Sequence, residues 1–107
     1  MAQAKSGKVV PLDPPARIAE RRVRALAQES RNVYLSKHAR HRMQERSVSF
    51  PQVIGCLKAG TIDEPFHIEA GCWTARFCWR TCGDLIRVVA KLEDRGDEKV
   101  VVITVIA

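Results

Sequence analysis

The sequence lacks an apolar run long enough to cross a membrane, since none approaches the ~20 residues that a spanning helix needs. The N-terminus, Met-Ala-Gln-Ala-Lys, also lacks the apolar core of a signal peptide. Both absences favour a cytoplasmic protein with no membrane partner.

Cysteine is scarce, and no two of the four cysteines form a C-x-x-C pair. Cys72, Cys78 and Cys82 are separated by five and three residues within what reads as one strand, which is a poor spacing for metal ligands. In a reducing compartment, small buried apolar side chains explain them better. The sequence therefore predicts reduced cysteines, no metal site and no other cofactor.

What the chain has in excess is positive charge. Its 107 residues suffice for one small domain, and they carry a formal net charge of +6. Residues 1–47 hold eleven Lys/Arg against four Asp/Glu, whereas residues 48–107 are close to neutral. This asymmetry indicates a polyanionic partner, and the alternative is a merely soluble surface. We expect a mobile basic arm over 1–12 and a single domain over 13–107.

Helical periodicity dominates the first half. Asp13 and the two prolines after it start a helix that runs to Gln28. Its arginines surround an apolar stripe of Ala19, Val23 and Leu26. Those arginines contact phosphate or a partner, or they form a solvated face.

The densest ionisable stretch, residues 38–46, also has helical spacing. His38, Arg42 and Glu45 share one stripe at i, i+4 and i+7. The neighbouring stripe is apolar and consists of Ala39 and Met43. One face of this helix therefore packs, while the other performs chemistry or forms salt bridges.

Capping signals bound this helix and the next. Ser36 is the expected cap of the 38–46 helix, after a brief strand at 32–35. A third helix begins at Ser49, with Gln52 as the second half of a capping box, and ends at Gly60 in the left-handed conformation. Its buried face consists of Val53, Ile54 and Leu57.

From Thr61 the period changes to two, which predicts strands. A two-residue turn at Ala70-Gly71 pairs Ile68 with Trp73 and His67 with Thr74. After a charged turn over 93–99, residues 100–106 are apolar on both faces and are expected inside the sheet or under a helix. The inner apolar set of the first hairpin is Phe66, Ile68, Trp73, Ala75, Phe77 and Trp79.

A second two-residue turn is expected at Gly83-Asp84. The inner pairs would be Phe77 with Ala90 and Trp79 with Val88, and the outer pairs would be Arg80 with Arg87 and Arg76 with Lys91. Like charges directly opposite each other cost stability. An outer face that stacks four cations makes sense if it binds phosphates, which would cancel the repulsion.

A metal-free ribonuclease needs a base for the ribose 2′-hydroxyl, an acid for the leaving 5′-oxygen, and cations for the transition state. The candidate catalytic residues are His38, Arg42, Glu45 and His67. The candidate nucleic-acid-binding residues are Arg46, Arg76, Arg80, Arg87 and Lys91.

These candidates have structural alternatives. Arg42 and Glu45 have the spacing of an ordinary salt bridge on a helix surface, and His38 could simply bond nearby backbone. His41, on the opposite side of the helix from His38, is the weakest catalytic candidate. The inner aromatic residues are assigned to packing rather than to base stacking.

The pattern H-A-x-x-R-M-x-E-R at 38–46, with Val48-Ser49, Leu85-Ile-Arg-Val-Val and a final Val-Ile-Thr-Val, resembles a small bacterial family of unknown function. The likeness covers residues 33–106. The order of helices before a sheet is also similar to BrnT- and RelE-type toxins of toxin–antitoxin pairs. The resemblance implies an RNA-cleaving sheet face, a partner antitoxin, and characteristic residues at His38, Arg42, Glu45 and Arg46.

We therefore expect an α+β fold, with two to three helices packed on one face of a twisted antiparallel sheet of about four strands. The expected function is a metal-independent endoribonuclease of bacterial toxin type that binds RNA on a basic sheet face. The alternatives are a non-catalytic nucleic-acid-binding protein and a protein-interaction module of a phage or mobile element.

Overall fold

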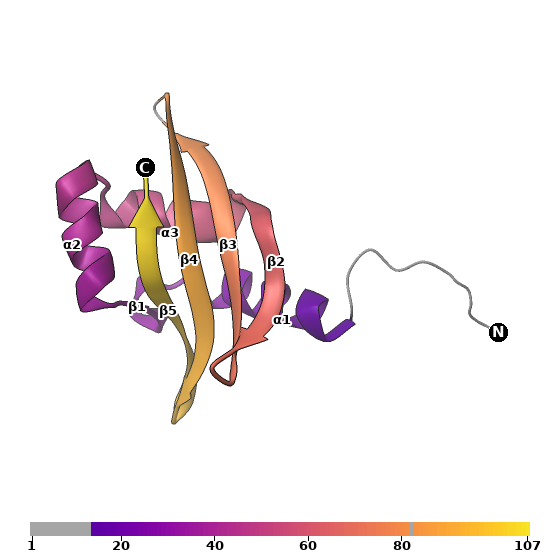
Figure 1. Cartoon of the computed structure of the whole chain (residues 1–107). Coiled ribbons are helices and arrows are strands. Elements are labelled where there is room, and N and C mark those ends of the chain that lie inside the picture. The colour runs from indigo at the N-terminus through magenta and orange to yellow at the C-terminus, as the bar shows by residue number, and fades with distance from the viewer. Residues whose placement is uncertain (1–13, 82) are drawn as a thin grey trace, which may run out of the picture.

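The computed structural model describes residues 14–81 and 83–107, which form three helices and a five-stranded sheet (Figure 1). The helices are α1 (Pro14–Leu26), α2 (Lys37–Arg46) and α3 (Phe50–Ala59). The strands are β1 (Val33–Leu35), β2 (Thr61–Glu69), β3 (Cys72–Thr81), β4 (Asp84–Arg95) and β5 (Asp97–Ile106). The predicted arm over 1–12, the predicted cap Asp13 and the cysteine Cys82 lie outside the described residues.

The strand order is β1-β5-β4-β3-β2. Neighbouring strands are antiparallel except β1, which is parallel to β5. The predicted α+β class is confirmed, whereas the sheet has one strand more than the expected four, and that edge strand has the other direction. The brief strand expected at 32–35 accounts for the difference, because Val33, Tyr34 and Leu35 pair with β5.

Helices α1 and α3 lie behind the sheet in Figure 1 and cover one of its faces, whereas α2 lies beside β5. The core contains fully buried Val53 and Leu57 from α3 and Phe77 and Val88 from the sheet. The apolar stripe of α3 thus meets the apolar set of β3 and β4. We call the opposite face, which no described helix covers, the open face. Among the described helices, none is long and apolar enough to span a membrane.

Local capping signals place both α2 and α3. Ser36 caps α2 as predicted, because its Oγ accepts the Ala39 N–H at 2.9 Å and donates to the Ile103 carbonyl of β5 at 2.9 Å. The apolar stripe of α2 is buried, also as predicted. Helix α3 begins with the predicted capping box of Ser49 and Gln52.

The first hairpin has the predicted register. Ala70 (φ 51°) and Gly71 (φ 81°) form its two-residue turn, and Ile68 pairs with Trp73. The side chain of Ile68 was expected on the inner face but is 56% exposed. The reason is its position on the edge strand, immediately before the end of β2.

The second hairpin differs from the predicted register by two residues. Thr81 pairs with Asp84, so Asp84 belongs to β4 rather than to the predicted turn. The inner pairs are Phe77 with Val88 rather than Ala90, and Trp79 with Ile86 rather than Val88. A shift of two residues keeps each side chain on its predicted face.

The third hairpin is tighter than predicted. Instead of a charged turn over 93–99, β4 continues to Arg95 and β5 begins at Asp97, with Gly96 between them at φ 88°. A left-handed residue at this position favours glycine. Residues 100–106 lie inside the sheet as expected, because β5 is flanked by β1 and β4.

Gly60 follows α3 in an extended conformation, with φ −69° and ψ 163°, so the predicted left-handed conformation is wrong. Glycine is favoured here for another reason. A Cβ at this position would lie 2.5 Å from the Cys56 carbonyl oxygen and 2.8 Å from that of Cys78. The end of α3 therefore approaches β3 so closely that no larger residue fits without a shift of backbone.

Arg24 joins α1 to α3 and to the sheet. Its guanidinium donates to the Leu57 and Lys58 carbonyl oxygens at 3.1 and 3.2 Å, which are acceptors at the end of α3. It also pairs with Glu20 at 3.0 Å and lies 5.4 Å from the Phe77 ring centroid. At least one arginine of the predicted basic helix is therefore a structural capping group.

We predict that Arg24→Ala lowers the free energy of unfolding by about 1–2 kcal/mol, because it removes the donor from two helix-end carbonyls. Arg21→Ala is the matched control, since Arg21 is exposed on the same helix and should change stability by less than about 0.5 kcal/mol. Urea unfolding followed by tryptophan fluorescence measures both. Equal effects of the two substitutions would contradict the capping role.

Candidate nucleic-acid interface

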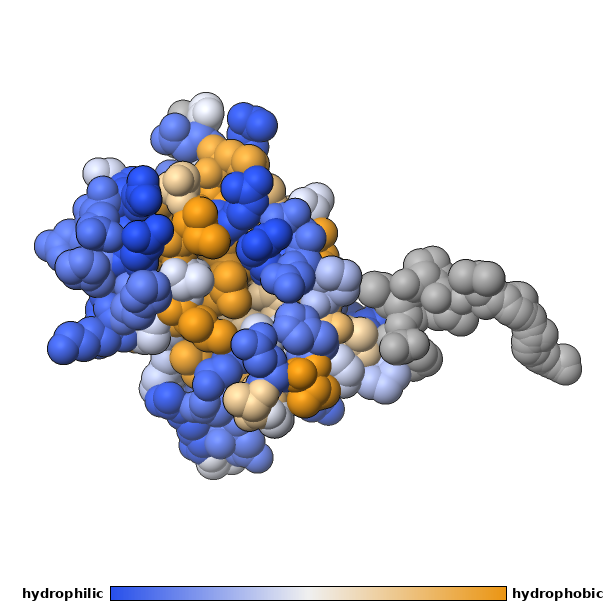
Figure 2. Space-filling model, in the orientation of Figure 1, coloured by the Kyte–Doolittle hydropathy of each residue, from blue (hydrophilic) through white to orange (hydrophobic). Residues whose placement is uncertain are grey.

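An apolar stripe runs along the middle of the open face (Figure 2). On β4, residues 86, 88, 90 and 92 are buried toward the helices, so the alternate residues point to the open face. The stripe consists of Leu85 and Val89 from β4, together with Ile106 and Val101 from β5, which pair with Arg87 and Lys91 on the same face. Figure 2 shows strongly hydrophilic residues on both sides of it, so the open face is an apolar floor between two polar rims.

One rim is α2. Arg40 lines an open hollow together with Phe50, which begins α3 on the covered side. Arg46, on the other flank of the buried stripe of α2, lines a hollow together with Leu85 of the apolar floor. By helical spacing, the predicted ionisable stripe of α2, which includes Arg42, lies on this second flank.

Within α2, Glu45 is shared by two partners. Its Oε1 is 3.4 Å from Arg42 Nη1, and its Oε2 is 3.4 Å from His41 Nε2. His38 is exposed and has no side-chain partner among the described residues. The histidine beside Glu45 is thus His41, which the sequence ranked below His38, and its i, i+4 spacing to Glu45 was the signal for this contact.

The other rim is organised by Asp63 on β2. One oxygen, Asp63 Oδ2, accepts hydrogen bonds from Arg76 Nε on β3 and from Arg87 Nε on β4, each at 3.0 Å. The exposed fraction of the side chain is 31% for Asp63, 34% for Arg76 and 37% for Arg87. Sequence reasoning placed both arginines on this face but missed the carboxylate that joins them.

The predicted like-charge pairs across β3 and β4 are wrong, because the actual neighbours are neutral. The observed pairs are Arg76 with Val89, Arg87 with Cys78, Arg80 with Leu85, and Lys91 with Thr74. Lys91 is also paired with Glu93 at 3.0 Å. Arg80 is exposed and has no side-chain partner in the described part of the chain. The expected repulsion between directly opposite cations, which suggested phosphate binding, is therefore absent from this pair of strands.

His67 lies on β2, at the margin opposite α2. Its Nδ1 is 2.9 Å from the Pro65 carbonyl oxygen, and its Nε2 is 3.1 Å from Glu69 Oε1. Both contacts are hydrogen bonds only when both ring nitrogens carry protons, so the bond to Pro65, followed by that to Glu69, raises the pKa of His67 above 6.5. Three strand spacings, about 14 Å, separate β2 from β5, which α2 borders. His38 and His67 therefore do not meet at one phosphate.

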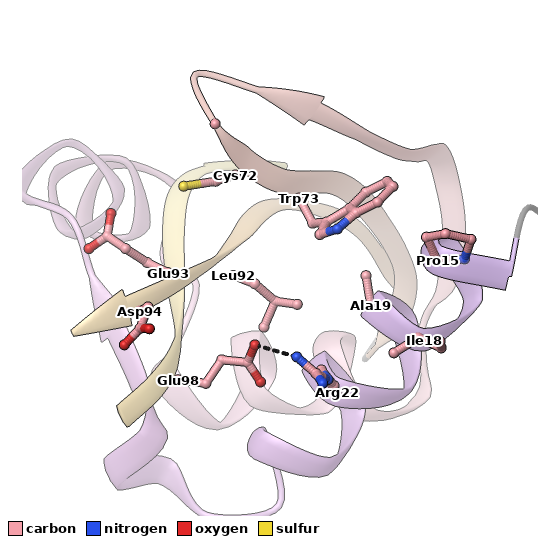
Figure 3. A pocket seen from close by; sticks show the side chains of 11 residues that line it. Pro15, Ile18, Ala19, Arg22, Cys72, Trp73, Leu92, Glu93, Asp94 and Glu98 are labelled. Atoms are coloured by element: carbon pink, nitrogen blue, oxygen red, sulfur yellow. Dashed lines mark hydrogen bonds and ion pairs between the residues drawn. The ribbon is translucent and has the colours of Figure 1, made fainter. Parts of the chain in front are cut away.

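A further pocket of about 220 Å³ lies between α1 and the ends of the hairpins (Figure 3). Trp73 and Leu92 line it beside Glu93, Asp94 and Glu98. Its acidic groups are already bonded within the protein. The bonds are Arg22 to Glu98 at 2.8 Å, Lys91 to Glu93 at 3.0 Å, and the Gly96 N–H to Asp94 at 3.1 Å.

The described cysteines are all free thiols. Cys56 is fully buried in α3, and burial raises the pKa of its thiol to about 12. Cys72 and Cys78 are half-buried on β3. Within residues 14–81 and 83–107, no three histidine, cysteine or acidic side chains gather as a metal site would require. Packing therefore accounts for Cys56, which is unreactive at neutral pH.

These features define an α+β protein with one sheet face covered by helices and the other presenting basic rims around an apolar floor. The chain belongs to the family described as Domain of unknown function (DUF4258), whose model matches residues 35–107. The match includes α2 and α3 and leaves α1 outside. No protein of curated function is detectably similar to the chain. The same is true of the solved structures.

We predict that NMR titration of the imidazole signals gives His67 a pKa above 6.5, and that Glu69→Gln lowers it. Because the folded pKa is raised, the linked stabilisation is present below pH ~6.5 and is lost as the pH rises through the folded pKa. Glu64→Gln is the control, since Glu64 acts on His67 only through space and more weakly. A larger effect of Glu64→Gln than of Glu69→Gln would contradict this assignment.

Proposed function

We propose that the protein binds RNA on the open face and cleaves it as a metal-independent endoribonuclease of the bacterial toxin type, restrained in the cytoplasm by an antitoxin partner. The observation that carries the proposal is the position of basic residues on both sides of an apolar floor. Arg42 and Arg46 belong to the α2 rim, whereas Arg76, Arg80 and Arg87 belong to the strand rim. Guanidinium groups suit phosphate, and an apolar floor suits the faces of unpaired bases.

The chemistry is assigned to α2. In such a reaction the ribose 2′-oxygen attacks the adjacent phosphorus while a base takes its proton, and the 5′-oxygen leaves with a proton from an acid. His38 is exposed and has no side-chain partner among the described residues, so its imidazole can reach a substrate as the proposed proton carrier. Arg42 would offset the charge that develops on phosphorus, and Glu45, 3.4 Å away, would hold its guanidinium in place.

A second candidate function is nucleic-acid binding without cleavage. The separation of His38 from His67 favours it, because α2 and β2 lie on opposite sides of the open face. The basic rims would serve a binder equally well. Affinity would then fall with salt, with a slope of about −0.7 for each phosphate contact on a single strand.

We predict that the purified protein cuts single-stranded RNA in the presence of EDTA and leaves 2′,3′-cyclic phosphate ends. His38→Gln should slow cleavage by about 100-fold or more, because it removes the proposed proton carrier. His67→Gln is the matched control and should cleave at nearly the wild-type rate. Intact RNA in a mixture where salt-sensitive binding is measured would instead establish the second candidate function.

Growth of bacteria during induction gives an independent prediction. The wild-type chain should arrest growth and fragment RNA, whereas Arg42→Ala with Arg76→Ala should not, because one cation is lost from each rim. Arg21→Ala with Lys58→Ala removes the same charge from exposed positions on the covering helices and should still arrest growth. Normal growth with the wild-type chain expressed in folded form would count against the toxin function.

A further inference from the structure

We propose that Asp63, Arg76 and Arg87 form a prearranged site for a single phosphate group, in which the arginines contact the phosphate and Asp63 is a positioning residue. The three residues come from the adjacent strands β2, β3 and β4. That the phosphate belongs to RNA rests on the proposed function. The site itself rests on the geometry of the three side chains.

The hydrogen bonds to Asp63 leave most donors of the two arginines available. Each arginine reaches Asp63 Oδ2 through Nε alone, at 3.0 Å. A guanidinium has five N–H groups, so the four on the Nη atoms of each arginine can bond another acceptor. In the described residues neither arginine has a further side-chain partner.

A shared oxygen also fixes how far apart the arginines lie. Because both Nε atoms are 3.0 Å from Asp63 Oδ2, they are no more than 6.0 Å apart. Two guanidinium groups at that distance can bond different oxygens of one phosphate. Without the carboxylate they would repel each other, and their long side chains would separate into solvent.

The electrostatic balance leaves the site attractive to an anion. Two guanidinium groups and one carboxylate carry a net charge of +1, and a phosphodiester carries −1. All three side chains are roughly one-third exposed, so a ligand can reach them. Asp63 therefore costs some attraction for phosphate but maintains the arrangement that two donors require.

The positioning role and a simple charge argument predict opposite effects of Asp63→Asn on phosphate binding. Removing a carboxylate from a basic face should tighten phosphate binding if only net charge matters. If Asp63 positions the arginines, Asp63→Asn should instead weaken binding about fivefold or more. Glu64→Gln is the matched control, because it removes the same charge from the next residue, which makes no ion pair in the described part of the chain. It should leave affinity unchanged or slightly tighter.

The experiment uses the full chain and two probes, a labelled single-stranded RNA and inorganic phosphate. RNA affinity is measured by fluorescence anisotropy, and phosphate binding by the NMR signals of Arg76 and Arg87 Nε–H. Phosphate should shift the Nε–H signals of both Arg76 and Arg87 in the wild type and in Glu64→Gln. In Asp63→Asn, phosphate should no longer shift both signals. In an Arg76→Ala, Arg87→Ala background, Asp63→Asn should no longer weaken RNA binding, because Asp63 acts only through those arginines.

The outcomes separate this site from the proposed function. RNA binding by Asp63→Asn that is as tight as that of Glu64→Gln would overturn the positioning role while leaving RNA binding intact. Phosphate shifts at both arginines that depend on Asp63, in a protein that does not bind RNA, would support the site and overturn the RNA function. No response to either probe would overturn both. Thermal unfolding of each variant shows whether the fold is retained.

Discussion

The close packing of α3 on β3 and β4 is the contact on which the other features depend. It requires glycine at two positions, since a Cβ at Gly55 would lie 2.4 Å from the Trp79 ring and one at Gly60 would meet backbone oxygens. Arg24 reinforces the contact from α1 by capping the end of α3. Because this layer buries one set of alternate strand residues, the other set is confined to the open face. The positions of the basic rims and of the apolar floor therefore follow from the packing of α3 on the sheet.

The net positive charge is divided between structural and available groups. Arg22 and Arg24 are engaged with Glu98 and Glu20, and Arg24 also caps α3. Exposed Arg46 and Arg80 have no side-chain partner among the described residues. A charge of +6 is thus a poor measure of binding surface by itself. The position of each cation relative to the open face matters more, because charges on the covering helices are screened from a ligand on the other side.

The sequence predicted those features that depend on nearby residues. The capping residue Ser36 and the capping box of Ser49 with Gln52 are local signals, and both were found where expected. Strand alternation predicted the face of each residue on β3 and β4 correctly but missed the register by two. The reason is physical: alternation has a period of two, so a slip of two residues leaves every side chain on the same face and gives no conflict in the pattern.

The features that the sequence did not predict depend on contacts between distant segments. Gly60 carries a familiar helix-end signal, yet its actual constraint is the approach of Cys78 from β3. Asp63 was missed because register shifts interrupt β2 between Ile62 and His67, which breaks the alternation that would place its side chain. The parallel pairing of β1 with β5 likewise joins segments far apart in the chain. Local patterns carry no information on such partners.

The width of the apolar floor links the proposed phosphate site to the proposed chemistry. The Asp63 cluster lies on β2, β3 and β4, whereas His38 and Arg42 lie on α2 beyond β5. A phosphate held by Arg76 and Arg87 is therefore a different phosphate from one that reacts at α2. If the proposed function holds, binding and cleavage of RNA are separate tasks on the two rims, with the intervening nucleotides over Val89 and Ile106. Under that proposal, substitutions of Asp63, Arg76 or Arg87 act on RNA affinity and substitutions on α2 act on the cleavage rate, because each rim would contact its own part of the RNA.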